Sequence, residues 1–115
     1  MGFYNTAMFV DLLNKRSWKK LEAKLQYVED EHARYFIQAV ALIMQADYDA
    51  AYLVLKDVPD HAFACQAGML KTDCMVELGN TSVDHRYSYQ TIMDCTHRPD
   101  IKQIVNTRFR FLKYD

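Results

Sequence analysis

Glycine and proline are scarce in this sequence, which contains three glycines and two prolines among 115 residues. Folds built from many short β-strands need frequent tight turns, and such turns favour these two residues. Long helices joined by a few corners need far fewer of them. The scarcity therefore favours an all-α fold, and the length predicts one domain over residues 1–115 with a single core.

An excess of charge of either sign is also missing, as is any long hydrophobic run. The formal net charge is −1 and the basic residues are spread along the chain, so no nucleic-acid partner is expected. No apolar stretch reaches the roughly 18 to 20 residues that a transmembrane helix requires. Residues 1–14 lack the basic start and small-residue cleavage site of a secretory signal, and we therefore expect a soluble, cytoplasmic protein.

The three cysteines, Cys65, Cys74 and Cys95, include no CxxC pair and are odd in number. In a cytosolic protein this pattern favours reduced, buried thiols, and we expect no structural disulfide. Cys95 and His97 are two soft ligands at close spacing, but zinc needs three or four, so no metal or other cofactor is expected. The sequence contains no GxxxxGK, GxGxxG or GxSxG segment, and we predict no enzymatic activity.

Apolar residues recur every three to four positions along most of the chain, which predicts about seven helices. Their approximate ranges are 6–15, 17–28, 29–45, 47–58, 61–78, 83–95 and 99–112. Ser17 is expected to cap the second helix through its hydroxyl group. Gly79 is expected to end the fifth helix in a left-handed cap, and Pro99 suits the first position of the last helix.

Three helix-turn-helix corners repeat along the chain at nearly constant spacing. They centre on Arg16, Ala46 and Gly79, which are 30 and 33 residues apart. This spacing is close to the period of about 34 residues that tetratricopeptide repeats show. The sequence therefore predicts a tetratricopeptide-like helical-repeat array of about three helix hairpins, followed by a closing C-terminal helix.

The middle repeat matches the tetratricopeptide pattern best. Tyr35 occupies its first aromatic position, Ala39 the small position where paired helices approach closely, and Leu42 the next large position. The match has departures, because Gln38 replaces an apolar residue and Pro59 arrives about one turn early. The repeat pattern is weaker outside this segment.

Stacked helix pairs form a concave wall from the first helix of each repeat, and partners usually lie along that wall. The register of the repeats turns eight apolar residues toward it: Val10, Leu13, Phe36, Val40, Ile43, Met44, Met69 and Val76. An apolar groove suits an amphipathic helix of a partner protein, inserted apolar face first. The alternative is that the closing helix fills the groove with Ile101, Ile104, Val105 and Leu112, which lie with Arg108 along one stripe of that helix.

The segment 33–79 resembles the small tetratricopeptide-like co-chaperones of bacterial type III secretion systems. The similarity rests on the turn Gln45-Ala46-Asp47-Tyr48, the hairpin end Val58-Pro59 and the corner Leu78-Gly79. The resemblance implies a cytoplasmic chaperone that holds a polymerisation-prone needle subunit monomeric, cradling its C-terminal helix together with a second small helical chaperone. A generic tetratricopeptide adaptor is the alternative function.

Overall fold

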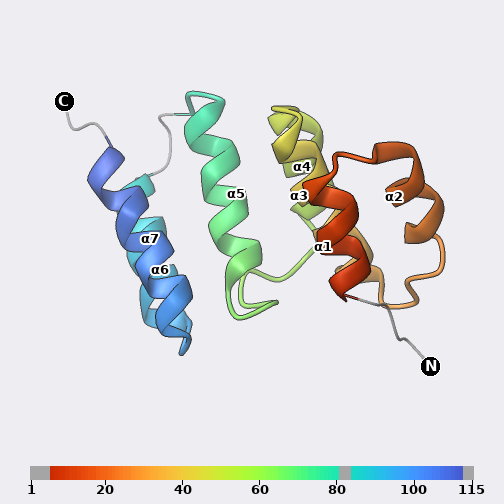
Figure 1. The fold of residues 1–115 in the computed structure, drawn as a ribbon. Coiled ribbons are helices and arrows are strands. Elements are labelled where there is room, and N and C mark those ends of the chain that lie inside the picture. Colours follow the sequence, from red (N-terminus) through yellow and green to blue (C-terminus); the bar gives the residue numbers. More distant parts are fainter. Residues whose placement is uncertain (1–5, 81–83, 113–115) are drawn as a thin grey trace. The chain divides into compact units, whose positions relative to one another are not determined.

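The computed structural model describes residues 6–80 and 84–112, and within them the chain forms seven α-helices and no strand (Figure 1). The helices are α1 (Thr6–Asn14), α2 (Trp18–Leu25), α3 (Glu31–Met44), α4 (Tyr48–Leu55), α5 (Gln66–Glu77), α6 (His85–Cys95) and α7 (Pro99–Phe111). The all-α prediction is confirmed. Val83, the expected first residue of the sixth helix, lies outside the described residues.

The chain divides into two compact units, Met1–Leu55 with helices α1 to α4 and Lys56–Asp115 with helices α5 to α7. Among the described residues, no helix has the length and apolar character that crossing a membrane requires. The tetratricopeptide type of the repeat and the single domain stay predictions.

All three predicted corners have the same backbone structure. Arg16, Ala46 and Gly79 adopt left-handed φ angles of 54°, 59° and 72°. In each corner the next residue donates its N–H group to a carbonyl five residues back: Ser17 to Leu12 at 2.9 Å, Asp47 to Leu42 at 2.9 Å and Asn80 to Met75 at 3.0 Å. This bond is typical of a helix that ends in a left-handed residue. The repeated corners are therefore confirmed at the level of hydrogen bonding.

The helix starts differ from expectation at one position. Asp30 caps α3, because its carboxylate accepts hydrogen bonds from the N–H groups of His32 at 2.9 Å and Ala33 at 3.2 Å. Ser17 has the N-cap position of α2 but makes no side-chain cap bond, so the predicted hydroxyl cap is wrong. Its ψ angle of 69° departs from the extended conformation in which a cap side chain reaches the first free amides.

Small residues allow the helices of the first unit to pack closely. Ala39 of α3 and Ala51 of α4 are both completely buried, at the positions where a bulky side chain would separate the two helices. Larger apolar side chains complete the core, and the fully or nearly buried ones are Phe9, Leu12, Leu21, Leu25, Val28, Ile37 and Leu55. Ala39, at the small position of the repeat pattern, is therefore completely buried in this unit.

The second unit has a core shared by three helices. Cys65, Met69, Tyr89, Ile92, Ile101 and Val105 form one buried cluster. In Figure 1, α6 and α7 run side by side next to α5. Helix α5 begins at Gln66, not near His61 as expected, because Phe63, Ala64 and Cys65 have left-handed φ angles.

The corner residues make a first prediction. Replacing Ala46 with glycine should raise the free energy of unfolding by about 0.5 to 1 kcal/mol, because glycine adopts the left-handed conformation without a steric penalty. Replacing Gly79 with alanine should lower it by about 1 kcal/mol. A Cβ atom at Gly79 would meet nothing within 4 Å, so its effect is that of the backbone alone. Urea denaturation measures both free energies of unfolding. A less stable Ala46→Gly variant, or a more stable Gly79→Ala variant, would contradict the corner structure.

Candidate protein-binding surface

Helix α3 carries apolar side chains around most of its circumference. Ile37 and Ala41 are buried, whereas Phe36, Val40 and Ile43 lie on a neighbouring side and are only half-buried. With 100° per residue, Phe36, Val40 and Ile43 fall within an arc of about 60°. A surface helix usually carries polar residues over an arc of this width where it faces solvent. An apolar stripe of α3 is therefore left partly uncovered.

We define the α3 face as this stripe plus the half-buried side chain that follows it, namely Phe36, Val40, Ile43 and Met44. Helix α1 also carries two apolar side chains that are not fully buried. Val10 is 48% exposed and Leu13 is half-buried, and they are three positions apart on one side of their helix. The Arg16 guanidinium donates a hydrogen bond of 3.2 Å from Nη1 to the Met44 carbonyl, which brings the C-terminal ends of α1 and α3 together.

The two ends of the α3 face differ in charge. Asp30 and Glu31 are exposed where α3 begins, and Lys15 and Arg16 are exposed beside the end of the helix. Lys15 also pairs with Asp11 at 3.2 Å, but both side chains are more than half exposed, so the pair contributes little energy. Asp47 is exposed directly after α3, so this end of the helix carries both acidic and basic side chains, whereas the start of α3 is mainly acidic.

The two predicted residues of the second unit lie in a different environment. Met69 is 4% exposed and belongs to the cluster that also contains Ile101 and Val105 of the closing helix. Val76 is half-buried and packs against the same cluster. Met69 therefore has no exposed surface to offer a partner, because α7 contributes to the core that surrounds it. In this unit the closing helix fills the space, while Ile104 is 40% exposed.

A small cleft lies between α2 and α3. Its volume is about 50 Å³, and its lining residues are Trp18, Leu21, Glu22, Leu25, Gln38, Ala41, Leu42 and Gln45. Pockets that bury a cofactor or drug-sized ligand usually have volumes of about 300 Å³ or more. The cleft is therefore large enough for a water molecule or the tip of a side chain and too small for a ligand of that size.

One carboxylate connects all three helices of the second unit. Asp73 of α5 accepts a hydrogen bond of 2.5 Å from the Tyr89 hydroxyl of α6 and a two-point ion pair from Arg108 of α7, with 2.9 Å from both Nε and Nη2 to the carboxylate. Tyr89 is 2% exposed. Its burial raises the pKa of the Tyr89 hydroxyl above the ordinary value, and the Asp73 carboxylate adds to the effect. This arrangement links the three helices of the unit through polar side chains.

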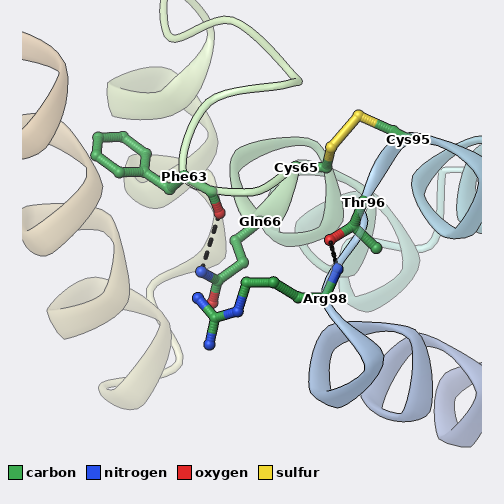
Figure 2. The surroundings of a disulfide bond; sticks show 6 residues. All are labelled: Phe63, Cys65, Gln66, Cys95, Thr96 and Arg98. Carbon is green, nitrogen blue, oxygen red and sulfur yellow. Dashed lines mark hydrogen bonds between the residues drawn. A yellow bond between two sulfur atoms is a disulfide. The ribbon is translucent and has the colours of Figure 1, made fainter.

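The cysteines differ from the sequence prediction. Cys65, just before α5, forms a disulfide with Cys95, the last residue of α6, so the prediction of reduced thiols is wrong for this pair (Figure 2). The hairpin of α5 and α6 brings the start of one helix to the end of the next, which sequence spacing alone does not reveal. Cys74 is free and buried, and burial raises the pKa of its thiol to about 11.

Metal-binding groups are not clustered in the described part of the chain. No three of its His, Cys, Asp or Glu side chains lie close enough together to hold an ion. Cys95, one of the two soft ligands noted in the sequence, is used in the disulfide. His97 is exposed two residues later.

The Tyr89 hydroxyl makes a prediction about alkaline pH. The unfolded chain releases this proton near pH 10, whereas the folded protein retains it, so stability should fall as pH rises above about 10. At about pH 11 this loss should reach roughly 1 kcal/mol relative to Tyr89→Phe. The control is Tyr87→Phe, because Tyr87 is 72% exposed on the same helix. Equal pH slopes for Tyr89→Phe and the original protein in urea denaturation would contradict the assignment.

Comparisons of this chain with protein-family models, with curated proteins and with solved structures return no match.

Proposed function

We propose that this chain is a protein-binding module that holds an amphipathic helix of a partner against the α3 face. The observation that carries the proposal is the partly exposed apolar stripe of Phe36, Val40 and Ile43 on the longest helix of the first unit. An amphipathic helix presents apolar residues at the same three- and four-residue spacing, so the two stripes can pack against each other.

Val10 and Leu13 widen the proposed contact. Because the Arg16–Met44 bond joins the ends of α1 and α3, a partner helix can contact side chains of both helices. The acidic start of α3 favours basic partner residues near Glu31. Such charge complementarity contributes mainly to orientation and association rate, and apolar burial contributes the affinity.

The resemblance to type III secretion co-chaperones extends this proposal to a cytoplasmic chaperone of a needle subunit. A self-associating helix is protected from polymerisation while its apolar face is buried against another protein. An all-α chain with repeated corners is compatible with this role, and a second small helical chaperone would complete the complex. A generic tetratricopeptide adaptor would use the same surface for a folded partner.

The surface can be tested with a charge placed in its centre. Val40→Glu should weaken binding of a peptide containing the C-terminal helix of a needle subunit by roughly 100-fold or more, because the contact would bury an unpaired carboxylate. Val40 is partly exposed, so in the free protein the new carboxylate can reach water and the thermal unfolding temperature should change by only a few degrees. Fluorescence anisotropy and circular dichroism measure the two effects.

Leu53→Glu is the matched control for this variant. Leu53 is 62% exposed on α4 of the same unit and lies outside the proposed surface, so this substitution should leave binding unchanged. Val10→Glu should weaken binding, because Val10 belongs to the α1 part of the surface. Peptide that binds Val40→Glu as tightly as the original protein would place the contact elsewhere. Unfolding of Val40→Glu would show that Val40 belongs to the core.

Solubility distinguishes a chaperone from an adaptor. A chaperone with an open apolar surface should self-associate when it is made alone, and co-expression with the helical partner should shift it to a soluble complex. Analytical ultracentrifugation of the chain with and without its partner measures this difference. A stable monomer at high concentration without a partner would favour the adaptor.

A further inference from the structure

Three consecutive residues that precede α5 have left-handed backbone conformations. The φ angles are 58° for Phe63, 55° for Ala64 and 71° for Cys65, and none of these residues is glycine. Side-chain-bearing residues adopt such angles at a steric cost and normally one at a time. The local sequence favours a different structure, since the segment 61–65 contains two alanines and its pattern predicts a helix from His61. Local preference and observed conformation therefore disagree.

Several contacts hold this turn in place. The Cys65 N–H group donates to the His61 carbonyl at 3.1 Å, and the Gln66 side chain donates to the Phe63 carbonyl at 2.9 Å (Figure 2). The Gly68 N–H group donates to the Asp60 carbonyl at 3.0 Å. The disulfide fixes the last residue of the turn, Cys65, to the end of α6.

The turn is also packed against α5. A Cβ atom at Gly68 would lie 3.1 Å from the Asp60 carbonyl oxygen and 2.6 Å from the Ile92 side chain, so the backbone passes close to this glycine. Lys71 pairs with Asp60 at 2.8 Å at the start of the turn. Among these constraints, the one that oxidation and reduction can add or remove is the bond between Cys65 and Cys95.

We infer that Cys65 and Cys95 form a redox switch that sets the start of α5. With the disulfide formed, residues 61–65 are held in the left-handed turn. When the disulfide is reduced, Cys65 is released from α6, and the segment adopts the right-handed helix that its sequence favours. The first turn of α5 then begins near His61, and the helix lengthens by about five residues.

The chemistry needs a thiol such as glutathione as reductant. A glutathione thiolate attacks Cys95, the more exposed of the two sulfur-bearing residues, and Cys65 leaves as a thiolate that takes up a proton. A second glutathione thiolate attacks the glutathione sulfur of the mixed disulfide, which releases Cys95 and oxidised glutathione. Two electrons thus pass from two glutathiones to the protein pair, and the reverse reaction uses oxidised glutathione as oxidant.

The remaining cysteine does not interfere with this exchange. Cys74 is completely buried, and the pKa of its thiol is raised to about 11, so little thiolate is present near neutral pH. The disulfide therefore exchanges within the pair Cys65 and Cys95. In a reducing compartment the extended helix would predominate, and in an oxidising one the left-handed turn would predominate.

Ala64→Gly tests the switch, because the substitution should stabilise the oxidised state and destabilise the reduced state. Glycine accepts the left-handed angle of the oxidised state and disfavours the helix of the reduced state. The equilibrium constant for oxidation by oxidised glutathione should therefore rise about tenfold. Ala62→Gly is the control, because Ala62 has no positive φ angle in the oxidised structure, and it should change the constant less than about threefold. Alkylation and mass spectrometry in glutathione buffers measure both.

A second measurement reports the backbone directly. The three-bond couplings between the amide and α protons of Phe63, Ala64 and Cys65 should fall to helical values in NMR spectra when the full-length protein is reduced. Couplings that stay unchanged, or that move to random-coil values, would overturn the inference. An unchanged or lowered oxidation constant for Ala64→Gly would overturn it as well.

Discussion

Three corners of this chain each contain one residue that reverses the hand of the backbone. At Arg16, Ala46 and Gly79 the left-handed conformation ends a helix. The next helix begins at Trp18 after the first corner and at Tyr48 after the second, whereas α6 begins only at His85. At only one of these corners is the residue glycine, so the other two adopt the conformation at a steric cost that the corner hydrogen bonds offset. The short corners then allow successive helices to bury their apolar sides against each other.

The two units stabilise their helices by different means. In the first unit the completely buried Ala39 and Ala51 let α3 and α4 pack closely, and no polar group is needed in that contact. In the second unit the Asp73 carboxylate joins three helices, and the Cys65–Cys95 disulfide adds a covalent link. This difference has a functional consequence. The first unit keeps an apolar stripe partly exposed, whereas the second unit uses its closing helix to cover Met69.

The helices and corners could be predicted from the sequence because their causes are local. Apolar spacing identifies a helix, and a glycine such as Gly79 identifies its end. Contacts between distant residues have no such signal. Asp73 and Arg108 are 35 residues apart, although the presence of Arg108 in an otherwise apolar stripe was a hint that a buried acidic partner exists. The disulfide and the left-handed turn before α5 depend on how the helices pack. The number and spacing of the cysteines therefore predicted free thiols, and the local pattern predicted an earlier helix start.

The predicted surface residues also differ in whether local spacing or a contact with a distant helix determines their exposure. Phe36, Val40 and Ile43 follow from the helical period and are half-exposed on one side of α3. Met69 was predicted from the same helical spacing, but its burial depends on Ile101, in a helix about 30 residues away in sequence. The repeat pattern does not determine the position of that closing helix. The sequence therefore identified the side chains of a helix face, and the tertiary structure decided which of them stay exposed.

The most direct test of the proposed function is to locate the contact on the protein itself. Methyl NMR spectra of the labelled chain, titrated with a peptide containing the C-terminal helix of a needle subunit, report each side chain separately. We expect saturable shifts of the Val40, Ile43 and Met44 methyl groups, with little change at Leu53. Shifts confined to methyl groups such as that of Ile104, or no saturable shift at any methyl group, would contradict it.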